Sequence, residues 1–194
     1  MNSNVVGLDT AKSIFHLYSQ AGSDKPVKKK LKRAEMLSYF ANLPVSLIGL
    51  EACSGAHYWA RELAKLGHEV VMLNAKFVKG FVVGNKNDFN DAEAIFTAIT
   101  RPNKRAVALK SDAQQDMQML HRLRQERVAE RTALTNQVRG FLAERGIVLA
   151  QGINSVRKQL PLILEDANNA LTPMGRELFA EQYQRLVEID ADIK

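Results

Sequence analysis

Alternating and continuous apolar runs divide the first hundred residues into short elements. The segment NVVGLDTA (4–11) is mostly apolar and β-prone, and apolar residues alternate with polar ones in SIFHLYSQ (13–20). After the turn-forming stretch AGSDKP, the segment VKKKLK (27–32) places Val27, Lys29 and Leu31 on one side and three lysines on the other. That pattern is typical of an exposed edge strand. We therefore expect three successive strands in an antiparallel meander.

Helical and strand patterns then alternate up to residue 100. AEMLSYFANL (34–43), GAHYWARELAKLG (55–67) and NDFNDAEAIFTAIT (87–100) have helical spacing, and Gly67 is expected to end the second helix. VSLIGLEA (45–52) and HEVVMLN (68–74) are continuous apolar runs typical of buried strands. The resulting order, β-β-β-α-β-α-β-α, predicts an α/β fold of the ribonuclease H-like (RuvC-like) type, with a mixed sheet and flanking helices.

Beyond residue 102 the pattern becomes helical. The stretch 111–146 is poor in glycine, and arginines interrupt its apolar heptad positions, which favours a helical hairpin with a basic midsection over a regular coiled coil. Segments 155–171 and 173–194 are predicted to be further helices, the last starting at Pro173. We therefore expect a catalytic α/β domain over residues 1–105 and an all-α, coiled-coil-like extension over residues 106–194.

Composition narrows the class of protein. The chain has 194 residues, 46% of them hydrophobic and 25% charged, as in an ordinary globular protein. No apolar run is long enough to cross a bilayer, and the first residues lack the basic start of a signal peptide. Cys53 is the only cysteine, so no internal disulfide can form, and the four histidines show no zinc-ligand spacing. These features predict a cytoplasmic protein.

Positive charge favours a polyanionic partner. The formal net charge is +6, and basic residues form three clusters along the chain. Any single cluster could be a solvated surface, but three of them together with an acidic motif favour nucleic acid. The clusters are Lys28–Arg33 (KKKLKR), then Lys76, Lys79 and Lys86, and finally Arg122, Arg124, Arg127 and Arg131.

Four carboxylates stand at positions that suggest a shared site. Asp9 lies in a strand-like run, Glu51 ends a buried strand, and Asp88 and Asp91 open the last helix of the α/β part. In the predicted topology the first and fourth strands are neighbours and the late helix packs across them, so the four groups should converge. Clustered carboxylates repel one another unless a cation lies between them, and Mg²⁺ prefers such oxygen ligands. Two such ions are suited to phosphodiester chemistry.

Each carboxylate also has a structural interpretation. Asn90 could cap the late helix, Glu93 could complete a capping box, and Asp91 would be favoured by the helix dipole. Asp88 could be a turn residue, Asp9 a strand-end residue and Glu51 a helix-start residue. Capping and metal binding are compatible, so both interpretations remain open for the pair Asp88 and Asp91.

Three segments resemble a known family in order and spacing. GLDTAKSIF, LEACSGAHYWARELAKLGHEV and KFVKGFVVGNKNDFNDAEAI are similar to the N-terminal domain of the DEDD insertion-sequence transposases, the group that includes Piv-type DNA invertases and bridge-RNA-guided recombinases. The resemblance covers about Val5 to Thr100, and the helical remainder in pattern only. Its specificity lies in the combination of the DxxK, E-A-x-x-G and K-N-D-x-x-D-A-E-A-I blocks.

The resemblance implies a function and a set of site residues. Asp9, Glu51, Asp88 and Asp91 match the family's acidic tetrad, which implies a catalytic site that binds Mg²⁺ or Mn²⁺ and acts on DNA phosphodiesters. It also implies a guide (bridge) RNA and a homo-dimer or higher oligomer formed through the helical region. The family's C-terminal domain, with its nucleophilic serine, matches no segment here, so complete strand exchange would require that further domain.

Basic residues near the tetrad and in the helical part are the predicted nucleic-acid contacts. We expect these residues to contact the backbone of a bound nucleic acid; the alternative is that they are ordinary solvated surface residues. The set is Lys12, Lys76, Lys79, Lys86, Arg124, Arg127 and Arg131.

Other functions are compatible with parts of the pattern. A RuvC-like structure-selective nuclease would use the same tetrad with water as the nucleophile. A fragment that only binds nucleic acid and dimerises would need no catalysis. GLDTAKS also distantly resembles the phosphate loop of sugar kinases and actin-like ATPases, but it lacks the glycine that would follow Asp9 in such a loop.

Overall fold

A computed structural model describes residues 4–20, 25–85 and 87–194, and the chain divides into two compact units, residues 1–111 and 112–194. Each unit has its own hydrophobic core. None of the described helices combines the length and apolar character that crossing a bilayer requires.

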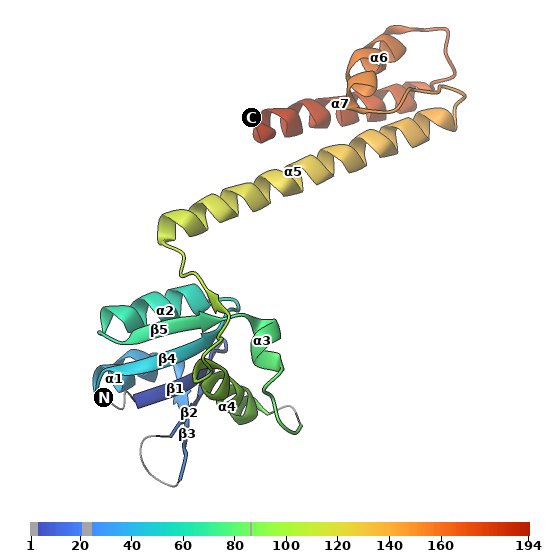
Figure 1. The fold of residues 1–194 in the computed structure, drawn as a ribbon. Coiled ribbons are helices and arrows are strands. Elements are labelled where there is room, and N and C mark those ends of the chain that lie inside the picture. Colours follow the sequence, from blue (N-terminus) through green and yellow to red (C-terminus); the bar gives the residue numbers. More distant parts are fainter. Residues whose placement is uncertain (1–3, 21–24, 86) are drawn as a thin grey trace. The chain divides into compact units, whose positions relative to one another are not determined.

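The first unit is built on one mixed sheet of six strands in the order β3-β2-β1-β4-β5-β6 (Figure 1). β1 to β3 form the predicted antiparallel meander, whereas β1, β4 and β5 are parallel and β6 is antiparallel to β5. This is the ribonuclease H-like order that the sequence predicted. The strands are β1 (Asn4–Asp9), β2 (Ile14–Ser19), β3 (Val27–Lys32), β4 (Ser46–Glu51), β5 (Glu69–Leu73) and β6 (Ala106–Val107).

Helices cover both faces of this sheet (Figure 1). On one face, α1 and α2 enclose a core that includes Phe15, Phe40 and Trp59. On the other face, α4 lies across the sheet and shares a core with α3 around Ile95 and Ile99. The elements are the 3-10 turn η1 (Arg33–Glu35) and the helices α1 (Met36–Ala41), α2 (Ala56–Lys65), α3 (Ala75–Lys79) and α4 (Asp88–Ile99).

Two glycines allow α4 to approach the sheet closely. A Cβ added at Gly7 of β1 would lie 2.2 Å from the Ala92 carbonyl oxygen and 2.5 Å from the Phe96 nitrogen, both in the α4 backbone. A Cβ at Gly49 of β4 would lie 3.0 Å from side-chain atoms of α4. Glycine is required at Gly7, because the α4 backbone occupies the space that a side chain would need. The close approach fixes where the N-terminus of α4 lies.

The second unit consists of three helices, α5 (Asp112–Ala143), α6 (Ile153–Glu165) and α7 (Pro173–Ile193). The expected helical hairpin over 111–146 is wrong, because α5 is one continuous helix of 32 residues. Its partner is α7, which the sequence did predict to begin at Pro173. The core between them includes Leu134, Val138 and Phe179. The arginines that interrupt the heptads fit one continuous helix, because Arg124 is exposed and Arg127 and Arg131 pair with acidic residues of α7.

Two boundary expectations also differ from the structure. The strand β6 follows residue 105, and the compact units separate between residues 111 and 112 instead of between 105 and 106. A strand of two residues is too short to show any periodicity. The N-cap of α4 is Asn87 and not Asn90, because the Asn87 side chain accepts a hydrogen bond from the Phe89 backbone nitrogen at 3.0 Å.

Candidate metal centre

Three carboxylates converge where β1 ends and α4 begins. Asp9 is the last residue of β1, and Asp88 and Asp91 lie in the first turn of α4. Each offers an oxygen that lies within 4.8 Å of the other two. Ligand oxygens around an octahedral Mg²⁺ are separated by roughly 3 to 4 Å, given metal–oxygen distances of about 2.1 Å. Small side-chain movements would therefore bring all three onto one ion.

The start of α4 leaves both aspartates available. Asn87 caps the helix, and Asn90 donates from its side-chain nitrogen to the Asn85 carbonyl oxygen at 2.9 Å. Neither Asp88 nor Asp91 is needed as the N-cap, although the helix dipole favours negative charge at both positions. Asp88 is well exposed, with 63% of its side-chain surface accessible. Asn87, and neither aspartate, therefore supplies the cap of α4.

Glu51 lies beside this cluster without belonging to the closest group. It ends β4, the parallel neighbour of β1, so both strands deliver a carboxylate at the same edge of the sheet. Glu51, Asp9 and Asp91 line one cleft of about 730 Å³. The structure thus brings oxygens of three of the four predicted acidic residues within 4.8 Å of one another, and the fourth, Glu51, lines a cleft together with Asp9 and Asp91.

Burial and neighbouring negative charge both disfavour the ionised forms of the cleft carboxylates. Burial, followed by the charges of Asp91, Asp88 and Glu51, raises the pKa of Asp9 to about 6. Burial and the neighbouring Asp91 also raise the pKa of Glu51. Clustered carboxylates with raised pKa values are what a divalent cation would neutralise. The donor set, all carboxylate oxygens, fits a hard cation such as Mg²⁺ or Mn²⁺.

His16 is a site residue that the sequence analysis missed. It is 5% exposed on β2, opposite Asp9 in the antiparallel register, and its Nδ1 lies 3.6 Å from the nearer carboxylate oxygen of Asp88. This nitrogen has no hydrogen-bond partner among the described residues. The Phe89 ring packs edge-on against the imidazole. His16 can be placed near the carboxylates only from the pairing of β1 with β2, because its spacing from the other histidines matches no known ligand pattern.

The predicted basic residues of the first unit fall into different environments. Lys76 and Lys79, both exposed on α3, line the cleft with Asp9, Glu51 and Asp91. Lys12 is exposed between β1 and β2. Lys86 lies outside the described residues.

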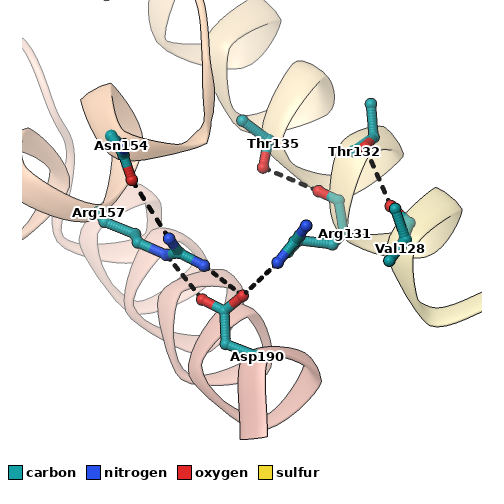
Figure 2. A network of polar contacts seen from close by, with 7 residues as sticks. All are labelled: Val128, Arg131, Thr132, Thr135, Asn154, Arg157 and Asp190. Atoms are coloured by element: carbon teal, nitrogen blue, oxygen red, sulfur yellow. Dashed lines mark hydrogen bonds and ion pairs between the residues drawn. The ribbon is translucent and has the colours of Figure 1, made fainter. Parts of the chain in front are cut away.

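The predicted arginines of α5 are also unequal. Arg124 is exposed, whereas Arg127 forms ion pairs with Glu130 and Asp192. Arg131 points towards α7, where it contacts Asp190 at 3.0 Å (Figure 2). Its structural ion pair gives no support to the predicted role in nucleic-acid binding. Sequence spacing alone could not separate an arginine facing a helix from one facing solvent.

Fold and site together define a ribonuclease H-like domain with a carboxylate centre suited to divalent cations. The protein-family model for IS110-type DEDD transposases, described as "Transposase", matches residues 6–146. The chain therefore belongs to this transposase family. Curated relatives agree. The chain is 41% identical over 196 aligned positions to a "Probable family 20 transposase" of Pseudomonas aeruginosa, and 39% identical over 201 to the "Transposase for insertion sequence element IS1328" of Yersinia enterocolitica.

The alignments cover a larger share of this chain than of its relatives. Both alignments cover 100% of this chain but 58% and 59% of the relatives, so the chain spans somewhat more than half of their length. Among solved structures, the Thermus thermophilus RuvC chain in complex with a Holliday junction substrate matches with a TM-score of 0.39 and 13% identity. That match covers 55% of this chain and 100% of the RuvC chain.

Proposed function

We propose that the first unit is the catalytic domain of a metal-dependent DNA transposase or recombinase that acts on DNA phosphodiesters. The observation that carries the proposal is the convergence of Asp9, Asp88 and Asp91 within 4.8 Å in a chain of the transposase family. Bound Mg²⁺ or Mn²⁺ would supply the activation of a nucleophile and the stabilisation of a leaving oxygen.

In this proposal each side chain has a separate task. Asp9, Asp88 and Asp91 hold the cation from two elements, and Glu51 completes the tetrad from β4. His16 helps to orient the Asp88 carboxylate, which lies 3.6 Å from its Nδ1. Lys76 and Lys79 attract the phosphate backbone to the cleft. The charge of the bound cation would favour the ionised form of Asp9, which burial and the neighbouring carboxylates disfavour.

For the second unit we propose binding of nucleic acid, including a guide RNA, and pairing of two copies of the chain. The support is the exposed surface of the first half of α5, which carries Arg122 and Arg124 together with Met117 and Leu120. Light scattering on the parent chain and on Leu120→Glu tests the pairing: we expect a dimer that the substitution dissociates. A monomeric parent chain would remove this part of the proposal.

Calorimetric titration with Mn²⁺ tests the metal site directly. We expect the parent chain to bind Mn²⁺ and the double variant Asp88→Asn with Asp91→Asn to lose the binding heat. The matched control is Asp112→Asn with Asp116→Asn, which removes the same charge from exposed positions at the start of α5. Equal binding by the parent chain and the Asp88/Asp91 variant would show that the pair only stabilises the helix end, and the catalytic proposal would be wrong.

A further inference from the structure

The edge strand β3 carries a face of lysines that the proposed catalytic site does not use. Lys28, Lys30 and Lys32 alternate with Val27, Lys29 and Leu31, and all three are exposed. Residues two apart on a strand point to the same face and lie about 6.8 Å apart. Among the described strands, β3 is the outermost and is paired with β2 alone. We call Lys28, Lys30 and Lys32 the β3 lysine face.

This face is on the same side of the sheet as α4 and the carboxylates. The Lys28 ammonium lies 3.1 Å from a carboxylate oxygen of Glu93 in α4, and the Lys30 ammonium lies 5.8 Å from the centre of the Phe89 ring. The alternate side chains face the other way: Leu31 joins the core under α1 and α2, and the Lys29 ammonium lies over the Tyr39 ring of α1.

The strand register connects this face to the carboxylates in one row. Asp9 pairs with His16, and His16 pairs with Lys30 on the next strand. Neighbouring antiparallel Cα atoms are about 4.5 to 5.5 Å apart, so the backbones of Asp9 and Lys30 are separated by roughly 10 Å. A lysine side chain can span a good part of that distance. The β3 lysine face therefore borders the acidic site.

The other side of the site is also cationic. Lys76 and Lys79 belong to α3, which follows β5, and they line the cleft with Asp9 and Glu51. In the sheet order, β1 with its Asp9 lies between β3 and β5. Positive charge thus flanks the carboxylates on both sides along a line that crosses the strands. A cluster of carboxylates alone would repel a phosphate chain.

We propose that DNA crosses the strands of the sheet, with its phosphates held by the β3 lysine face on one side of the carboxylates and by Lys76 and Lys79 on the other. The inference rests on the proposed function. It adds the direction in which the DNA runs relative to the strands, and a second surface that contacts its phosphates. Contacts of this kind position the substrate and are independent of base sequence. The exposed lysines also keep other strands from adding to this edge.

The test compares two double variants with equal change in charge. Lys30→Gln with Lys32→Gln removes two members of the β3 lysine face. Lys29→Gln with Lys65→Gln removes two lysines associated with the opposite face, where Lys29 contacts α1 and Lys65 belongs to α2. Binding of a fluorescein-labelled DNA duplex of unrelated sequence is followed by anisotropy over a salt series. Ca²⁺ is present to neutralise the carboxylates.

We expect the Lys30/Lys32 variant to bind about tenfold or more weakly at low salt, and its slope of log affinity against log salt to become shallower by about 1.8, near 0.9 for each lost phosphate contact. The Lys29/Lys65 control should keep the parental slope. Thermal unfolding of both variants checks that each is folded.

The outcomes separate this inference from the proposed function. If the parent chain binds DNA and both double variants retain its slope, the β3 lysine face makes no phosphate contacts and the inference is overturned, while the metal site stands on its own calorimetric test. A parent chain that binds Mn²⁺ but no DNA would overturn the inference and restrict the proposed function to the cation. A shallower slope in the control as well would show a general charge effect, which also contradicts the inference.

Discussion

At the scale of single residues, Asp9 is the carboxylate that its surroundings perturb most clearly. Its raised pKa of about 6 results first from burial and then from three neighbouring carboxylates. A proton and a cation therefore compete for the same group near neutral pH. We therefore expect the protonation of Asp9 to affect both the metal affinity and the stability of the metal-free chain.

Metal affinity should rise with pH. Below pH 6 most of Asp9 carries a proton and cannot act as a ligand, so we expect Mn²⁺ affinity to increase by up to tenfold per pH unit there and to level off above about pH 7. Calorimetric titrations between pH 5 and pH 8 measure this dependence. Affinity that stayed constant over this range would show that Asp9 does not bind the ion.

The metal-free chain should show the opposite effect in its stability. The folded-state pKa of about 6 lies above the reference value of 3.8, so folding favours the protonated form and stability falls as pH rises through this range. Asp9→Asn should therefore raise the free energy of unfolding at pH 7 by roughly 1 to 2 kcal/mol, after allowance for solvent screening at a half-buried site. Urea unfolding in EDTA measures the change, and a destabilised variant would contradict it.

The sequence predicted the acidic residues of the proposed site but not the residues that surround them. Asp9, Glu51, Asp88 and Asp91 stand at element ends, where polar residues interrupt apolar patterns, and such positions are visible in a single sequence. His16 lies in an ordinary alternating strand, and its contact with Asp88 depends on how β1 and β2 pair. Register is set by turns and by the whole core, so it is not visible along the chain.

At the scale of elements, the position of α4 determines whether the carboxylates meet. Asp88 and Asp91 reach Asp9 because the α4 backbone lies almost against β1 at Gly7. The first turn of α4 therefore places two of the proposed metal ligands beside Asp9. Any residue that lifts it from the sheet should separate those ligands.

We expect Gly7→Ala to weaken both folding and metal binding. The added methyl group would meet backbone atoms at 2.2 and 2.5 Å, which only a shift of α4 can relieve, at a cost of about 1 to 3 kcal/mol or more. Gly140→Ala in α5 is the matched control, because nothing lies within 4 Å of its added Cβ, and alanine should stabilise that helix by about 0.5 to 1 kcal/mol. Thermal unfolding and Mn²⁺ titration of both variants decide the point.

One aspartate of α7, Asp190, forms ion pairs with both α5 and α6. Asp190 accepts hydrogen bonds from Arg157 Nε at 2.7 Å and from Arg131 at 3.0 Å, and it joins the three helices (Figure 2). Although burial opposes ionisation, the two guanidinium groups hold the pKa of Asp190 below its ordinary value. Asp190 is 19% exposed, so its charge is only partly screened.

We expect Asp190→Asn to lower the free energy of unfolding of the second unit by about 1 to 3 kcal/mol, because two partly buried guanidinium groups lose their counter-charge. Asp192→Asn, which removes an exposed contact to Arg127 at 3.6 Å, should change it by less than about 0.5 kcal/mol. Urea unfolding followed by circular dichroism compares the two. Equal effects would show that the network adds little to stability.

The elements were predicted well where periodicity was long or turn residues were strong. The meander, the parallel strands and α2, α4 and α7 follow directly from apolar spacing, Gly67 and Pro173. The single helix α5 was mistaken for a hairpin because Arg124, Arg127 and Arg131 interrupt its heptads. Those arginines are compatible with one helix, since α7 offers acidic partners such as Asp190 and Asp192. Such partners are distant in sequence and cannot be inferred locally.

At the scale of the whole molecule, the chain consists of two units with separate cores. The first unit, residues 1–111, contains all of the proposed metal ligands, and the second unit buries its own cluster around Val138, Leu160 and Phe179. Units with independent cores generally fold on their own.

We therefore expect residues 1–111, produced alone, to fold cooperatively and to bind Mn²⁺ with an affinity within about threefold of the parent chain. The reason is that no ligand of the proposed site comes from the helical unit. Circular dichroism and calorimetric titration of the isolated unit measure both properties. An isolated unit that folded but bound no Mn²⁺ would show that the helical unit contributes to the site.

The position of α4 has a consequence for the newly made chain. Asp9 and Asp88 are 79 positions apart, and α4 ends only at Ile99. At synthesis rates of 5 to 20 residues per second, Asp9 emerges about 4 to 16 seconds before Asp88 does. During that interval β1 and its neighbours can pair, but Asp88 and Asp91 of α4 are not yet present beside Asp9. The proposed cation site can therefore form only once α4 docks on the strands β1 to β5, after most of the first unit has been made.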